Sequence, residues 1–297
     1  MKQELRKYAA FTYRYMRYLI KKGLTKYDIY TDEECIEKIV NEKKSIARYG
    51  DGEFKWILGI KQNSFEKGSQ KLAKELKQII EEDNENLIVG ITHSMFTLKN
   101  YNYEAKNYWC RFLEQYIKDI KQIVRYDKKY CDASITRPYI DYKSKKGCAK
   151  KFANLKKIWD KKHILIVEGR YTRLGVTNDF FDNSKKINRI LCPEKNAYAK
   201  VDEIEKEIIK NYKKGMIVLI SLGPTATVLA SRLSKKNIQT IDIGHIDVEY
   251  EWFLNNATEK INIPGKYVNE SKEVFVEDEQ LDLKKYEKQI ISKIELK

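Results

Sequence analysis

Residues 216–227 read Met216-Ile217-Val218-Leu219-Ile220-Ser221-Leu222-Gly223-Pro224-Thr225-Ala226-Thr227. The first seven are almost all apolar, which predicts a short strand buried on both faces. The Gly-Pro pair then begins a helix, because proline is tolerated in the first helical turn, where its missing N–H is not needed. A buried strand followed by a helix is the unit from which parallel sheets are built.

The same unit recurs along the rest of the chain. Strands are expected over residues 45–49, 86–91, 163–170, 187–192, 216–222 and 237–243, and helices over 1–24, 71–82, 103–130, 202–212 and 224–233. This alternation predicts an α/β fold, a Rossmann-like, mostly parallel sheet with helices on both faces. Residues 31–34 read as a capped helix start, and residues 143–151 as a charged, mobile link. We divide the chain into a basic amphipathic helix (1–30), a main domain (31–273) and a charged C-terminal helix or tail (274–297).

Composition and charge restrict the class of partner. The 297 residues are 42% hydrophobic, enough for a large core, and the net charge is +15. A polyanionic partner, such as nucleic acid, anionic lipid or a charged glycan, would suit that charge. The lysines, however, are spread over the whole chain, whereas nucleic-acid-binding folds usually cluster them, so no nucleic acid partner is expected.

The sequence favours a cytoplasmic protein. It has no run of about 18 apolar residues and no signal-peptide pattern at the N-terminus. The five cysteines are an odd number without close pairs, so we expect reduced thiols and neither disulfides nor a zinc site. The basic helix at residues 1–24 could lie on the inner face of the cell membrane or pack on its own domain.

Polar, glycine-spaced turns follow nearly every predicted strand. Ligands of open α/β sheets bind beyond the carboxyl ends of the strands, so these turns are expected to meet. The polar residues in them are Asp51 and Glu53; Thr92 and His93; Glu168, Arg170 and Arg173; Thr225 and Thr227; and His245, Asp247 and Glu249. A purely structural domain has no need to concentrate such residues there, so the pattern favours an enzyme.

The acidic pair Asp51 and Glu53 is the candidate metal site. Gly50 and Gly52 flank Asp51 and let the backbone come close to a ligand. Two carboxylates aimed at one point can hold a divalent cation that carries a phosphate. An ordinary acidic turn is the alternative, since aspartate and glycine are common turn residues.

The other turns suggest further roles. Arg48, Arg170 and Arg173 could neutralise a diphosphate. The helix start after Gly223 presents backbone N–H groups to a phosphate or carboxylate, and Thr225 and Thr227 could contact a phosphate or the acceptor. The candidate general bases are His245, Asp247 and Glu249.

Several enzyme classes lose support. The chain contains no Gly-x-x-x-x-Gly-Lys-Ser/Thr loop and no Gly-x-Gly-x-x-Gly fingerprint, so P-loop ATPases and dinucleotide dehydrogenases are not favoured. It also lacks the Gly-x-Ser-x-Gly turn that carries the nucleophile of α/β-hydrolases.

From about Lys43 to Glu270 the sequence resembles the GT-D fold glycosyltransferase family, a bacterial group with a metal-binding Asp-x-Glu (DXE) motif. The segments that carry the resemblance are residues 47–54, 167–183, 192–197, 222–227, 242–252 and 265–270. Thr177 stands where a glycine is expected, so the loop from Arg173 to Asp182 should be shaped slightly differently here.

The resemblance implies hexosyl transfer from a UDP-sugar to a glycan acceptor, lipid-linked or protein-linked, in polysaccharide or glycoprotein glycan biosynthesis. It implies Mn²⁺ or Mg²⁺ as cofactor, held by Asp51 and Glu53. It assigns further matched positions to the donor pocket. The full expected donor set is Arg48, Gly50, Gly52, Glu168, Arg170, Arg173, Asn178, Asp179, Gly223, Thr225, Thr227 and Lys266. Acceptor specificity is expected to differ in the segment 101–160.

Two alternatives stay open on the sequence. The same carboxylates would serve another metal-dependent phosphoryl or nucleotidyl transferase, which releases phosphate or pyrophosphate. A non-catalytic basic module for an anionic glycan or nucleic acid would instead show steep salt dependence and indifference to metal.

Overall fold

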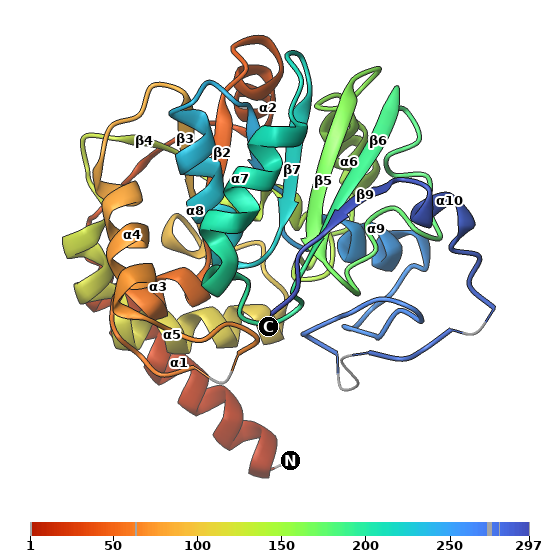
Figure 1. Cartoon of the computed structure of the whole chain (residues 1–297). Coiled ribbons are helices and arrows are strands. Elements are labelled where there is room, and N and C mark those ends of the chain that lie inside the picture. The colour runs from red at the N-terminus through yellow and green to blue at the C-terminus, as the bar shows by residue number, and fades with distance from the viewer. Residues whose placement is uncertain (1, 63, 272–274, 279, 297) are drawn as a thin grey trace.

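The computed structural model describes residues 2–62, 64–271, 275–278 and 280–296. Its described part contains one sheet of nine strands in the order β1-β4-β3-β2-β8-β7-β5-β6-β9, and every strand pairing is parallel (Figure 1). The strands are β1 (Asp28–Ile29), β2 (Ser45–Tyr49), β3 (Leu87–Ile91), β4 (Lys129–Asp132), β5 (His163–Gly169), β6 (Lys186–Cys192), β7 (Ile217–Ser221), β8 (Thr240–Asp242) and β9 (Ile290–Lys293). The predicted parallel sheet is therefore confirmed.

Helices cover both faces of the sheet. They are α1 (Lys2–Lys22), α2 (Asp32–Asn41), α3 (Asp51–Ile57), α4 (Gln70–Glu81), α5 (Tyr103–Ile123), α6 (Cys148–Lys156), α7 (Val201–Asn211), α8 (Pro224–Ser234), α9 (Ile246–Leu254) and α10 (Lys284–Glu287). Helices α3, α4, α5, α7 and α8 contribute to one hydrophobic core, and α2, α6 and α9 to the other. In Figure 1, α7 and α8 lie in front of the strands and α6 behind them.

The strand sequences explain this layering. In β5, Leu165 and Val167 point into the core under α7 and α8, whereas Ile164 and Ile166 point into the opposite core. Successive side chains of a strand alternate between faces, so a strand buried on both sides must be apolar at nearly every position. This is the continuous apolar run seen in the sequence.

Two expected segments differ in the structure. The expected helix 103–130 ends at Ile123, and its last residues form β4 instead. The expected link 143–151 contains the start of α6 at Cys148, after Gly147 with φ at 83°. The segment 274–297 holds α10 and the edge strand β9, which pairs with β6. No helix in the described ranges is long and apolar enough to cross a membrane.

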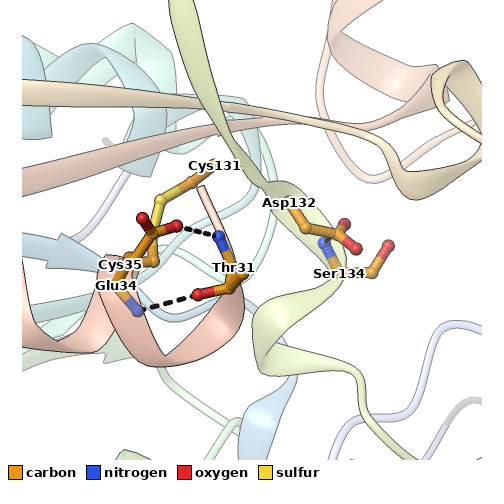
Figure 2. The surroundings of a disulfide bond; sticks show 6 residues. All are labelled: Thr31, Glu34, Cys35, Cys131, Asp132 and Ser134. Carbon is orange, nitrogen blue, oxygen red and sulfur yellow. Dashed lines mark hydrogen bonds between the residues drawn. A yellow bond between two sulfur atoms is a disulfide. The ribbon is translucent and has the colours of Figure 1, made fainter. Parts of the chain in front are cut away.

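The expected helix start at Thr31 is confirmed. Thr31 Oγ1 accepts a hydrogen bond from the Glu34 N–H at 3.1 Å, and the Thr31 N–H donates to Glu34 Oε2 at 2.7 Å, which is a capping box (Figure 2).

The expectation that all cysteines are reduced is wrong for one pair. A disulfide joins Cys35 of α2 to Cys131 of β4, with the two Cα atoms 6.2 Å apart (Figure 2). The two cysteines are 96 residues apart, and only the packing of α2 beside β4 brings them together. Spacing along the chain could not reveal such a pair. Cys110, Cys148 and Cys192 are buried free thiols.

Strand β8 joins the two halves of the sheet, because it lies between β2 and β7. Its pairing with β2 rests on the single register pair Ile46 and Ile241. The Arg48 guanidinium reinforces this seam with an ion pair to Asp242 Oδ1 at 2.9 Å.

Candidate active site

The connections after β5 and β7 leave the sheet in opposite directions. The chain after β5 moves outward to β6, whereas the chain after β7 returns through α8 to β8. Diverging connections leave a crevice at the carboxyl ends of neighbouring strands, where α/β proteins bind ligands. A cleft with about 430 Å³ of empty volume, part of it open solvent, lies there. Its lining residues are Phe65, Gly169, Thr172, Pro193, Glu194, Ala197, Ser221, Leu222, Gly223, His245, Tyr267 and Asn269.

Gly223 forms the turn between β7 and α8 at the floor of this cleft. Its φ is 53° and ψ is −136°, a backbone conformation that only glycine adopts readily. A Cβ atom at this position would lie 2.5 Å from Cζ of Phe65. The sequence prediction of a glycine turn at the start of α8 is therefore explained by both backbone conformation and space.

A loop after α3 carries Phe65 across to the second half of the sheet. The Asn196 N–H donates to the Phe65 carbonyl at 2.9 Å. The buried Glu66 accepts from the Tyr198 N–H at 3.1 Å and from Thr225 Oγ1 at 3.3 Å. The Thr225 side chain therefore holds this loop and does not face the cleft.

The acidic pair lies in the first turn of α3, at the carboxyl end of β2. Glu53 Oε2 accepts from the Gly50 N–H at 2.8 Å and so caps the helix. Burial raises the pKa of Glu53 to about 7; the negative charges of Asp242 and Asp51 add to this rise, and the Gly50 hydrogen bond opposes it.

Asp51 has cationic and phenolic neighbours. Its Oδ2 accepts from Lys55 Nζ at 2.5 Å and also from the Tyr108 hydroxyl. No group of three or more His, Cys, Asp or Glu side chains among the described residues is arranged to hold a metal. Two carboxylates nevertheless fit Mg²⁺ or Mn²⁺, because such ions commonly complete their shell with water and substrate phosphates.

Arg48 lies near the end of β2 and Thr227 lies in α8, and the side chains of both make hydrogen bonds within the fold. Besides its ion pair with Asp242, Arg48 donates through Nη1 to Thr136 Oγ1 at 2.6 Å. Thr227 Oγ1 donates to the Arg48 carbonyl at 3.0 Å and is buried. Gly244 lies directly over the guanidinium, since a Cβ there would be 1.9 Å from Arg48 Nη2.

Only one of the three candidate bases lines the cleft. Asp247 is fully buried and accepts from Lys266 Nζ at 2.5 Å and from Asn178 Nδ2 at 2.8 Å. Glu249 is also fully buried and accepts from the Tyr139 N–H at 3.0 Å. Asp247, Lys266 and Asn178 thus hold α9 to the loops around it.

His245 is half-buried and lines the cleft at the end of β8. Burial lowers its pKa, and the cationic side chains of Arg137 and Arg48 act in the same direction, while Glu270 and Asp242 oppose them. The imidazole is therefore neutral near pH 7 and able to accept a proton.

The predicted donor residues at the end of β5 and in the loop after it range from buried to exposed. Glu168 is fully buried, with an ion pair to Arg189 Nη1 at 2.6 Å. Arg173 donates to the Gly265 carbonyl at 2.8 Å, and the exposed Asp179 accepts from Lys156 Nζ at 2.8 Å. Arg170 is exposed beside the cleft residue Gly169.

The backbone conformation of Thr177 shows how the loop accommodates a threonine where a glycine was expected. Its φ is 76°, in the region that glycine adopts without strain. The Thr177 hydroxyl donates to Glu251 Oε1 at 2.6 Å. The loop therefore keeps the backbone conformation of a glycine, with a side-chain hydrogen bond to α9 in addition.

Several residues of the site were not predicted individually. Glu194 follows Pro193 at the end of β6, so the strand-end rule that selected the other turns would have found it. Tyr267 and Asn269 fall in the segment 265–270 that carries the family resemblance, but no local pattern marks them. Phe65 lies in a loop far from any strand end in the sequence, and nothing in its surroundings points to the cleft.

Comparison with curated proteins finds bacterial glycosyltransferases. "Probable glycosyl transferase Gly" of Streptococcus gordonii is 35% identical over 264 residues, which make up 88% of this chain and 38% of that protein. "Glycosyltransferase GlyD" of Streptococcus pneumoniae serotype 4 is 34% identical over 264 residues, 88% of this chain and 32% of that protein. The chain thus spans about a third of the length of these relatives.

Solved structures share the fold. One described as "The highly conserved domain of unknown function 1792 has a distinct glycosyltransferase fold" has a TM-score of 0.86 and 34% identity, and the match covers 94% of this chain and 100% of that one. Another, "A New Glycosyltransferase (DUF1792) from Streptococcus sanguinis", has a TM-score of 0.83 and 32% identity, over 91% of this chain and 100% of that one. A sequence model described as "Glycosyltransferase GT-D fold" matches residues 46–271. Sequence and fold together establish that the chain belongs to the GT-D fold glycosyltransferase family.

Proposed function

We propose that the protein transfers a hexose from a UDP-sugar to a glycan acceptor. The observation that carries this proposal is the position of the cleft. It lies where the connections of β5 and β7 diverge, next to the N-terminus of α8, in a chain of a glycosyltransferase family. A helix N-terminus favours anions through its free N–H groups and its dipole, so it suits the diphosphate of a nucleotide sugar.

The cleft supports a nucleotide in two further ways. Phe65 and Tyr267 supply aromatic surface on which a nucleobase can stack. Arg170 is exposed beside the cleft residue Gly169, and we assign it to the diphosphate charge. Asp51 and Glu53 would hold Mn²⁺ or Mg²⁺, which would supply positive charge to the nucleoside diphosphate as it leaves.

We assign the general-base role to His245. Its imidazole lines the cleft, whereas Asp247 and Glu249 are fully buried. A base must come within hydrogen-bond reach of the acceptor hydroxyl, which excludes a carboxylate enclosed by the protein. Asp247 instead positions the loop after β5, because it accepts from the Gly175 N–H and from Asn178 Nδ2.

The acceptor is proposed to be a growing glycan of a surface polysaccharide or glycoprotein, made in the cytoplasm. The names of the two streptococcal relatives state glycosyl transfer and no substrate. Association with the inner membrane surface through residues 1–24 is argued separately below, from the exposed face of α1.

The test is nucleotide release from a panel of UDP-sugars, with Mn²⁺ and with EDTA, for wild type and Asp51→Ala. We expect one sugar to give metal-dependent UDP release that Asp51→Ala abolishes. Asp202→Ala is the matched control, because Asp202 is also in the first turn of a helix and its side chain is 63% exposed. Release of phosphate or pyrophosphate would identify a different transferase. Absence of both turnover and metal-dependent UDP binding would refute the proposal.

A further inference from the structure

Helix α1 carries two apolar faces, and only one of them is covered. The inner face packs on α5 through Phe11, Tyr15 and the buried Tyr18. Lys21 Nζ extends this contact with an ion pair to Glu114 Oε1 of α5 at 2.9 Å. This packing fixes the rotation of the helix and so determines which side chains face outward.

The outer face is a line of large apolar side chains in contact with solvent. Tyr13, Met16 and Ile20 follow one another at spacings of three or four residues, which places them on one side of α1. Leu24 lies just beyond the end of the helix, after Gly23. The exposed fractions of these four side chains are 62%, 54%, 76% and 99%. Figure 1 shows α1 at the margin of the fold, with its N-terminal end extending beyond the other helices. Single exposed apolar residues are ordinary, but three in line on one helix face, with a fourth just beyond its end, indicate an interaction surface.

The charges around this line select its partner. Residues 2–26 contain eight lysines and arginines and one acidic residue, Glu4. Arg6 is exposed on the helix and Lys26 is exposed after its end, whereas Arg17 pairs with Glu114 of α5 at 2.9 Å. A helix with an apolar stripe between cationic side chains matches the boundary between the acyl chains and the headgroups of an anionic bilayer.

We propose that Tyr13, Met16, Ile20 and Leu24 dock α1 on an anionic lipid surface. The apolar side chains enter the boundary region, and exposed cations such as Arg6 and Lys26 contact lipid phosphates. A second copy of the chain is disfavoured as occupant, because two helices of this charge would face each other in a protein whose net charge is already +15. This docking is independent of the chemistry proposed for the cleft.

The test is co-sedimentation of the full chain with vesicles. Mixed phosphatidylcholine–phosphatidylglycerol vesicles should bind the protein, and pure phosphatidylcholine vesicles should bind it far less. The triple variant Met16→Ser/Ile20→Ser/Leu24→Ser should reduce the partition coefficient at least about 100-fold, since three large apolar side chains no longer leave water. Circular dichroism should show unchanged helix content, because all three side chains are exposed.

The matched control replaces three large apolar residues that are exposed elsewhere on the protein: Ile209→Ser/Leu254→Ser/Ile261→Ser. This variant should bind mixed vesicles like wild type. The proposal is overturned if wild type ignores mixed vesicles, or if the triple variant of α1 binds them as well as the control does. It is also overturned if the wild type is a dimer in solution that the α1 variant converts to a monomer, because the stripe would then belong to a second copy.

Discussion

Replacement of Gly223 by alanine tests whether the floor of the cleft depends on the contact with Phe65. The backbone at Gly223 has a φ of 53°, and a Cβ there would lie 2.5 Å from the Phe65 ring. Backbone strain alone should cost about 1–3 kcal/mol of unfolding free energy. Displacement of the ring should cost about 1–3 kcal/mol more, the usual range for overpacking.

Gly215→Ala is the matched control. Gly215 also has a positive φ, 92°, but a Cβ there meets nothing within 4 Å. The control therefore carries a backbone penalty without the clash. The double variant Gly223→Ala/Phe65→Ala removes the clash while keeping the strain, so a double-mutant cycle isolates the contact.

Two assays read the outcome. Urea unfolding should show Gly223→Ala to be less stable than Gly215→Ala, with a coupling of about 1–3 kcal/mol to Phe65→Ala. Calorimetric titration should show weaker UDP binding by Gly223→Ala and unchanged binding by Gly215→Ala. Equal stability of the two glycine variants, together with zero coupling to Phe65→Ala, would refute the reasoning.

Three further predictions concern the base, a buried carboxylate and the disulfide. His245→Gln should lower the rate of sugar transfer about 10²–10⁴-fold and leave UDP affinity near wild type; a rate loss below tenfold would exclude His245 as the base. Burial raises the pKa of Glu249 from 4.5 to about 7. Between these two pH values the folded state keeps a proton that the unfolded state has lost. The free energy of unfolding should therefore fall by up to about 3 kcal/mol as the pH rises through this interval. Glu249→Gln should flatten that part of the pH profile of urea unfolding, and an unchanged slope would contradict the shift. Dithiothreitol should lower the unfolding free energy by about 4 kcal/mol, because the Cys35–Cys131 disulfide closes a long loop, and Cys35→Ser/Cys131→Ser should not respond to it.

Most strands of the sheet were predictable because burial on both faces forces a continuous apolar run. Strands β4 and β9 could not be predicted from the sequence. β4 is only four residues long, Lys129–Asp132, and follows a helix with similar composition. β9, Ile290–Lys293, is an edge strand whose side chains alternate between half-buried and exposed, so its sequence reads as part of a charged tail.

The site shows the same division. The turns after the strands could be located in the sequence, because each one directly follows an apolar run. The direction of each side chain could not, because it depends on the residue that the side chain contacts in the fold. Glu168 turns inward to Arg189 and Asp247 to Lys266, and neither partner is suggested by local sequence. Asp51 and Glu53 lie in the first turn of α3, so helical geometry, and not an extended backbone, sets where their carboxylates point.

The seam between β2 and β8 has a consequence for biosynthesis of the chain. Arg48 and Asp242, which meet across it, are 194 residues apart. While the protein is being synthesised, β2 can pair with β3 but its other edge stays open until β8 has left the ribosome. An open edge of apolar strand is a template for pairing with other chains. The nascent N-terminal half therefore passes through an aggregation-prone interval that ends only when β8, the strand just before His245, has been synthesised.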